Sequence, residues 1–189
     1  MARWSVILVA ATALAAACTP LPSPQVLLRP DVTAPLPELP LLPGPWHSSQ
    51  LLTVQARGQE DRLPVEIELN GGRLVVIAFT TWGGRVLTVT YDGRAITAEA
   101  SGPGAALPPP SQVIADVLMV NWPIHGWSLP PGWRFDQQFE VRRLRDAASR
   151  VVAEVRYPEP GTSDDIQLVN NAYGYRLSIR TLSGDAPMR

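Results

Sequence analysis

The residue best suited to covalent chemistry in this 189-residue chain is its single cysteine, Cys18. It directly follows Ala15-Ala16-Ala17, and ahead of these small residues lie one cation, Arg3, and the apolar stretch 6–14. A basic head, a short apolar region and a small-residue exit together form a secretory signal. The apolar stretch is shorter than the roughly 20 residues that a transmembrane helix needs. Because no second cysteine exists to form a disulfide, the thiol of Cys18 is available for acylation.

The sequence around Cys18 resembles the lipobox of bacterial lipoproteins, in which the thiol is diacylated and the signal is removed. The position three residues before the cysteine, which is usually Leu, Val or Ile, is Ala15 here, and Leu14 lies one step further out. The alternative is an ordinary signal-peptidase site, with Cys18 as a bystander. By the sorting rule of Gram-negative lipoproteins, Thr19 in place of Asp implies release to the outer membrane. We expect residues 1–17 to be the signal peptide and Cys18 to anchor the chain, facing the periplasm.

Residue patterns that support catalysis, metal binding or nucleic-acid binding are missing from the sequence. It contains no GxSxG nucleophile motif, no P-loop and no GxGxxG fingerprint. His47 and His125 stand alone, and Glu66 and Glu68 alternate with apolar residues as on the polar face of a strand. The net charge of −1 provides no basic surface for nucleic acid. We therefore expect a protein that is not an enzyme and has no metal, no cofactor and no nucleic-acid partner.

Proline content divides the mature chain into two parts. Residues 18–46 contain the acylated cysteine and a dense run of prolines, which favour extended polyproline II structure and cannot donate backbone hydrogen bonds. This segment is expected to be a tether, part of which, around Val26-Leu27-Leu28, packs onto the folded body. The body itself is expected to be one β domain, residues 47–189.

Period-two alternation of apolar and polar residues predicts a series of β-strands in that domain. It is clearest at Val65, Ile67 and Leu69, and turn residues such as Asn70-Gly71-Gly72 and Asp92-Gly93 separate the strands. Successive hairpins with one apolar face each predict an antiparallel sheet curled around a single core. The exception is the segment 111–121, which lies between two proline-rich sequences. We interpret it as a short buried helix, capped by Ser111, and a strand is the alternative.

Tryptophan supplies the strongest indication of function. Trp82 lies between two predicted strands, in Phe79-Thr80-Thr81-Trp82-Gly83-Gly84, where a hairpin tip is normally polar. An apolar residue at a loop tip typically contacts a membrane or a ligand. The alternative is that Trp82 fills the core, as tryptophan does in many β domains. Trp122, Trp127 and Trp133 follow the predicted helix, and a core role suits Trp122 and Trp133.

Four segments together resemble a group of LolB-like outer-membrane lipoproteins, catalogued as a domain of unknown function, whose genes often accompany aryl-polyene or related synthesis clusters. These are Cys18 with its proline-rich segment, residues 84–93, Ala115-Asp116-Val117-Leu118 before Trp122-Pro123, and residues 174–179. The resemblance implies a mainly β fold of the LolA/LolB type: an unclosed antiparallel β-barrel with a short helical lid over an apolar cavity. It also places Trp82 where LolB has an exposed leucine.

The resemblance implies a carrier or acceptor that binds a lipid or acyl chain and acts in lipid, polyene-lipid or lipoprotein transport. Its partners would be the membrane, the lipid or lipoprotein acyl chain and a periplasmic carrier protein. The alternative is a structural or assembly lipoprotein with a filled β core and no ligand. The residues expected to contact lipid are Val76, Phe79, Trp82, Val89, Val117, Leu118, Val155, Leu177 and Ile179.

Replacement Cys18→Ala is expected to release a folded protein into the periplasm, because the acyl chains supply about 0.8 kcal/mol of membrane affinity per buried methylene and the β domain does not depend on them. Cell fractionation after a high-salt wash measures this. Retention of the variant in the outer-membrane fraction would show that another part of the chain provides the main anchor.

Overall fold

A computed structural model of the chain describes residues 23–39, 45–101, 108–159 and 164–187. The predicted signal peptide and Cys18 lie outside these residues. The described strands and helices, in chain order, are β1 (Gln25–Arg29), β2 (Val32–Pro35), β3 (Trp46–Ala56), β4 (Gln59–Asn70), β5 (Arg73–Phe79), β6 (Arg85–Tyr91), β7 (Ile96–Ala100), α1 (Pro110–Asn121), the 3-10 helix η2 (Ile124–Gly126), β8 (Arg134–Gln138), β9 (Val141–Arg145), β10 (Val151–Arg156), β11 (Ile166–Asn170) and β12 (Tyr175–Gly184).

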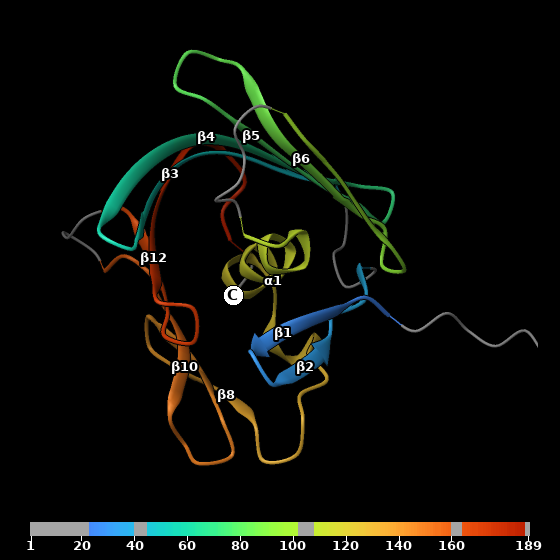
Figure 1. The fold of residues 1–189 in the computed structure, drawn as a ribbon, viewed down its shortest axis with the longest axis vertical. Coiled ribbons are helices and arrows are strands. Elements are labelled where there is room, and N and C mark those ends of the chain that lie inside the picture. The colour runs from blue at the N-terminus through green and yellow to red at the C-terminus, as the bar shows by residue number, and fades with distance from the viewer. Residues whose placement is uncertain (1–22, 40–44, 102–107, 160–163, 188–189) are drawn as a thin grey trace, which may run out of the picture.

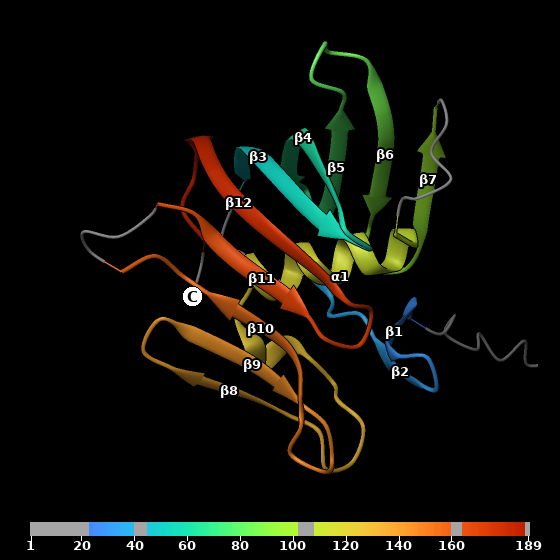
Figure 2. The same ribbon diagram turned by 60° about the vertical axis from the view of Figure 1, so that its left-hand side comes forward.

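The described strands form a curled antiparallel sheet with two free edges. Its 10 strands follow the order β7-β6-β5-β4-β3-β12-β11-β10-β9-β8, and β7 and β8 do not pair with each other. The first and last parts of the sheet meet through β3 and β12, which pair along most of their length. Figure 1 shows the sheet curving around α1, and Figure 2 shows its strands in succession. The predicted fold class is confirmed: mainly β, with a large unclosed antiparallel sheet and one short helix.

Two local features of the backbone set the register of the strands. Gly71 and Gly72 both have positive φ, at 57° and 76°, as a two-residue type I′ hairpin requires. At Asp92-Gly93 the sequence predicts the same turn, but only Gly93 has a positive φ, and the loop runs to Ala95.

The second feature is an irregularity in β10 between Val151 and Ala153, which places Val152 and Ala153, and not Val151, in the core.

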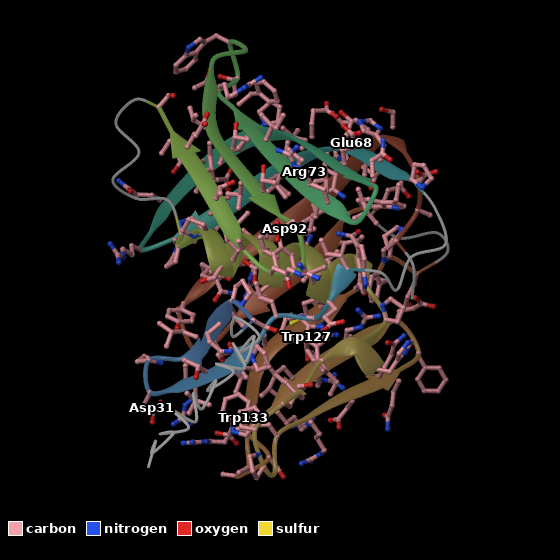
Figure 3. All side chains as sticks on the ribbon, turned by 90° about the vertical axis from the view of Figure 1, so that its right-hand side faces the viewer. Asp31, Glu68, Arg73, Asp92, Trp127 and Trp133 are labelled. Atoms are coloured by element: carbon pink, nitrogen blue, oxygen red, sulfur yellow. The ribbon has the colours of Figure 1, made fainter. Side chains whose placement is uncertain are left out.

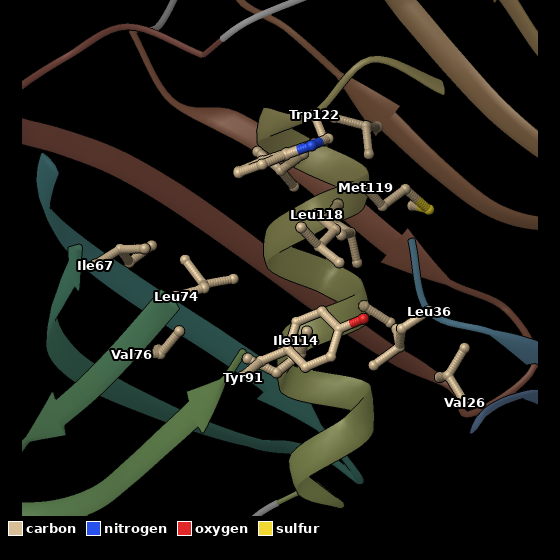
Figure 4. Packing of buried hydrophobic residues seen from close by; sticks show 14 of the residues in the cluster. Val26, Leu36, Ile67, Leu74, Val76, Tyr91, Ile114, Leu118, Met119 and Trp122 are labelled. Atoms are coloured by element: carbon tan, nitrogen blue, oxygen red, sulfur yellow. The ribbon is translucent and has the colours of Figure 1, made fainter. Parts of the chain in front are cut away.

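The segment 111–121 is helical, so the strand alternative is excluded. The helix begins at Pro110, not at Ser111, and no side chain caps its N-terminus. Pro110 suits this first position because its missing N–H would have no helical partner there. Most of α1 is buried, since the sheet covers one side and the segment containing β1 and β2 covers the other. Figure 4 shows Ile67, Leu74, Val76 and Tyr91 on the sheet side of the helix, and Val26 and Leu36 opposite them.

The C-terminal end of α1 is held by side chains from the sheet. The guanidinium of Arg142, on β9, is fully buried and donates from Nη1 to the carbonyls of Met119 (2.6 Å) and Trp122 (2.7 Å). The hydroxyl of Tyr157 donates to the carbonyl of Val120 at 2.6 Å. The last carbonyls of a helix have no partner within the helix, and a cation placed there also interacts favourably with the helix dipole. These bonds fix the position and rotation of α1 inside the sheet.

Part of the predicted tether belongs to the folded body. Strands β1 and β2 pair as a hairpin that forms its own two-stranded sheet. Alternate residues of β1 face inward: Val26 and Leu28 are buried, whereas Leu27 is 42% exposed. Ala34, Leu36 and Leu39 are buried as well. The hairpin lies against α1 on the open side of the curved sheet (Figure 1). Proline at this density therefore does not prevent a short hairpin whose apolar side chains have a surface to cover.

Replacement Arg142→Met is expected to lower the free energy of unfolding by about 3 kcal/mol, because two buried helix carbonyls lose their donor. Arg142→Lys should recover part of this loss through its single ammonium group. Arg176→Met, at an exposed position on β12, is the control and should change stability by less than about 0.5 kcal/mol. Urea unfolding measures all three, and a loss below about 1 kcal/mol in Arg142→Met would contradict this role of the guanidinium.

Candidate functional site

The residues predicted to contact lipid occupy two different environments. Val76, Val89, Leu118, Val155 and Ile179 are buried in the core. Leu177 and Val117 are partly buried and pack against that core, whereas Phe79 is partly exposed near the end of β5 and Trp82 is exposed beyond it. The structure thus brings most of these residues together on and around α1, where they form part of the packed core. It places Phe79 and Trp82 apart from them, at and beyond the end of β5.

The concave side of the sheet is filled. The pocket between β1, α1 and the strands β8–β11 has a volume of only about 20 Å³, close to the space that one water molecule occupies. A larger hollow, of about 340 Å³, lies where β9, β10 and β11 meet, and charged residues such as Glu140, Arg156 and Asp165 line it. Such a lining does not suit an acyl chain. Neither of these two pockets is an open apolar cavity of lipid size.

The small pocket lies on one face of α1. Gln112, Ala115, Asp116 and Met119 all line it, and their spacing of three and four residues places them on the same side of the helix. The remaining walls are mostly apolar: β1 covers the pocket with Val26 and Leu28, and Trp127, Phe135, Leu144 and Val152 complete it. Trp127 and Phe135 meet edge to face, with 5.6 Å between ring centroids. Figure 3 shows Trp127 near the centre of the molecule.

A buried polar cluster adjoins these apolar walls. Asp116 accepts hydrogen bonds from the hydroxyl of Tyr175 (2.6 Å) and from Nε2 of Gln112 (2.9 Å). Asn170 donates from Nδ2 to the same Tyr175 hydroxyl at 3.1 Å. Burial raises the pKa of Asp116 to about 7, and the hydrogen bonds from Tyr175 and Gln112 only partly oppose this rise. Burial, followed by the neighbouring Asp116, raises the pKa of the Tyr175 hydroxyl too.

Trp82 lies at the tip of a well-ordered hairpin that extends beyond the rest of the sheet (Figure 2). Its side chain is 84% exposed, which excludes the alternative that it fills the core. The loop is closed by hydrogen bonds between Thr80 and Gly84: the backbone N–H of Thr80 donates to the Gly84 carbonyl (2.7 Å), and the Gly84 N–H donates to Oγ1 of Thr80 (2.9 Å). Gly83, with a φ of 88°, makes the tight turn. The loop therefore presents the indole to solvent from a fixed base.

Sequence reasoning did not single out Gln112, Asp116 and Tyr175 as site residues, nor Arg142. The sequence nevertheless contains a pattern that marks Asp116 and Arg142. Asp116 is the one ionisable residue in the otherwise uncharged helix 110–121, and Arg142 has the same strand parity as the buried Leu144. A polar residue at a position that the pattern predicts to be buried needs a partner, and this is the observation that would have found both.

Within the described residues, no group of three or more His, Cys, Asp or Glu side chains is arranged to hold a metal ion. Over the same residues, no helix combines the length and the hydrophobicity that a membrane crossing requires.

Comparison with known proteins identifies the family. Residues 47–183 match the family described as a protein of unknown function, DUF3261. The chain belongs to this family. Searched against curated proteins, the sequence finds no significant match. Among solved structures, the fold is similar to a LolA superfamily protein, NE2245, from Nitrosomonas europaea, with 8% identity over 78% of this chain and 89% of that chain and a TM-score of 0.42.

A second solved structure is a domain from Vibrio parahaemolyticus described as an outer membrane lipoprotein-sorting protein domain. It is 7% identical to this chain, the match covers 75% of this chain and 85% of that chain, and the TM-score is 0.38.

The elevated pKa of Asp116 predicts an unusual dependence of stability on pH. An aspartate in an unfolded chain has a pKa of about 4, whereas that of folded Asp116 is about 7. Between these values the folded protein holds a proton that the unfolded chain has lost, so the free energy of unfolding falls as pH rises from about 4 to about 7, by at most about 4 kcal/mol. Asp116→Asn should flatten this part of the profile. Urea unfolding at a series of pH values measures it, and identical slopes in the two proteins would contradict the assignment.

Proposed function

We propose that this protein is an outer-membrane lipoprotein that accepts a lipid or acyl chain on the periplasmic side and passes it on in lipid, polyene-lipid or lipoprotein transport. The curled sheet supports this, because its concave side is apolar and would suit an acyl chain if the β1–β2 hairpin moved away. The signal-like sequence that ends at Cys18 supports a membrane anchor. The resemblance of residues 84–93 and 174–179 to LolB-like lipoproteins supports the same role.

The single observation that carries the proposal is the exposure of Trp82. A side chain of this size, 84% exposed at a hairpin tip, contributes little to the stability of the fold. An indole partitions favourably into the lipid interface, so the tip is suited to touch a membrane or to receive an acyl chain. The hydrogen bonds between Thr80 and Gly84 close the base of the loop that carries the ring.

A second candidate function is favoured by the filled interior. Among the residues that the structure describes, only about 20 Å³ is free beneath β1, which is too little for a lipid at that place. A structural or assembly lipoprotein would need none, and Trp82 would then contact another protein. The two functions differ in whether the concave side ever opens.

Lipid extraction and mass spectrometry of protein purified from the native membrane without detergent distinguish the two. A carrier should yield an acyl-chain compound in a fixed ratio to protein, in addition to the lipid attached to Cys18. Comparison with the Cys18→Ala protein separates bound from attached lipid. If the protein lacking the anchor is free of lipid after incubation with outer-membrane vesicles, the carrier proposal fails and the assembly function remains.

Replacement Trp82→Glu is expected to leave the melting temperature nearly unchanged, since exposed positions usually tolerate substitution within about 0.5 kcal/mol. Transfer of a fluorescent phospholipid from donor vesicles should nevertheless fall by at least tenfold, because a charge replaces the ring that enters the interface. Leu182→Glu is the matched control: Leu182 is an apolar residue, 58% exposed, that lies within β12 and not at a loop tip, and its replacement should not affect transfer. Equal transfer by the wild type and Trp82→Glu would exclude the tip as the contact.

A further inference from the structure

We propose that the ligand site is the groove beneath the β1–β2 hairpin, and that its ligand is a single acyl chain ending in an uncharged alcohol or amide head group. In this structure the hairpin itself occupies the groove, so that Val26 and Leu28 stand in for the apolar chain. The inference deepens the carrier function and rests on it.

The first support is the way the hairpin is attached. It forms no strand pairing with the 10-stranded sheet. Its polar contacts with the body include the ion pair of Arg29 with Asp146 at 3.0 Å and the hydrogen bond from the Tyr173 hydroxyl to the Leu27 carbonyl at 3.2 Å. Just after β2, the Tyr91 hydroxyl also donates to the carbonyl of Pro37 at 2.8 Å. Beyond these contacts the hairpin is held by the burial of its apolar side chains, so it can leave its site without breaking a strand pairing of the main sheet. The hairpin also follows closely after Cys18, so its position can respond to the membrane anchor.

The second support is the shape and chemistry of the groove. The α1 face from Gln112 to Met119 rises about 10 Å along the helix, at 1.5 Å per residue. Its polar groups lie at the start and near the middle, at Gln112 and Asp116, and Met119 lies at the far end. Leu144 and Val152 extend the apolar surface from the sheet. If the hairpin leaves, the groove therefore offers a hydrogen-bonding end followed by an apolar floor.

The third support is an incomplete set of hydrogen bonds. Nε1 of Trp127 is buried and has no acceptor among the residues that the structure describes. Trp127 lines the same pocket as Asp116, whose hydrogen bonds come from two neutral groups, Gln112 and Tyr175. A buried donor without an acceptor is costly in an apolar surrounding. A ligand group that accepts from Trp127 supplies the missing acceptor, and the same group can add a donor to Asp116.

These groups restrict the head group of the ligand. Each carboxylate oxygen of Asp116 retains a lone pair for a further donor. An alcohol or an amide supplies an acceptor for Trp127 Nε1, which has none, and a donor that Asp116 can still accept. A carboxylate head would place a second negative charge beside buried Asp116 and should be rejected. The site therefore favours uncharged acyl alcohols and acyl amides over free fatty-acid anions.

The test compares two substitutions on adjacent residues of β1 in the mature full-length protein. Val26→Asp places a charge on the buried face of the strand and should displace the hairpin, whereas Gln25→Asp, on the exposed face and outside the pocket lining, should not. Equilibrium binding of N-palmitoylethanolamine is measured at pH 8, with palmitate as the charged counterpart. We expect Val26→Asp to bind the amide at least tenfold more tightly than the wild type, because the competing hairpin is removed. Gln25→Asp should match the wild type, and palmitate should bind at least tenfold more weakly than the amide.

Each outcome has a separate meaning. Equal amide binding by the wild type and Val26→Asp would overturn the hairpin as occupant while leaving the carrier function intact. Equal binding of amide and palmitate would overturn the head-group assignment. Absence of binding in every form would end the carrier function itself.

Hydrogen exchange in the wild type provides a test that does not depend on folding of Val26→Asp. Saturation with N-palmitoylethanolamine should speed exchange of the amides in β1 and β2, while those of α1 and β9 keep their protection. Greater protection of β1 and β2 on binding would contradict displacement.

Discussion

The buried guanidinium of Arg142 is the interaction on which the rest of the structure depends. A curled sheet with two free edges leaves its concave side open, and one helix has to cover most of it. The contacts of Arg142 with the carbonyls of Met119 and Trp122 join that helix to β9. Because α1 is apolar on nearly every side, hydrophobic burial alone would not select its rotation. The directional hydrogen bonds at its C-terminus select one rotation.

The rotation of α1 decides which residues face the sheet and which face the hairpin. Ile114 and Leu118 are completely buried. Gln112, Ala115, Asp116 and Met119 then form the opposite face, toward β1. A buried carboxylate in the middle of a helix is costly, since burial of Asp116 opposes its ionisation. The fold tolerates this group because Tyr175 and Gln112 supply hydrogen bonds, and its position beside an apolar groove is what a site for an amphipathic ligand requires.

The sequence predicts the fold well where period two is regular. Strand β4 with Val65, Ile67 and Leu69 in the core, and the glycine turn at Gly71 and Gly72, follow directly from the pattern. Alternation alone cannot show an inserted residue, so it does not predict the change of parity between Val151 and Ala153. For the segment 18–46, the prediction correctly places Val26 and Leu28 against the folded body but misses the β1–β2 pairing, since proline content reports on backbone donors and not on the apolar surface that a segment covers.

In the candidate site, too, local patterns predict some features and cannot predict others. Exposure of Trp82 follows from local signals, namely the flanking threonines and glycines, and the structure places the ring in solvent. The pocket beneath β1 depends on contacts between residues far apart in the chain, such as Asp116 with Tyr175 and α1 with β1. No local pattern encodes these contacts. The packing of the interior likewise depends on such distant contacts. A ligand can therefore enter only by replacing the β1–β2 hairpin in the groove.

The most direct test of this account is photocrosslinking inside the groove. A benzophenone amino acid in place of Phe135, an aromatic residue of the pocket wall, is activated in living cells, and the products are analysed by mass spectrometry. The account predicts a crosslink to an acyl-chain compound with an uncharged head group. Crosslinks confined to residues 25–35 of the same chain would show that the hairpin never leaves the groove and would contradict it.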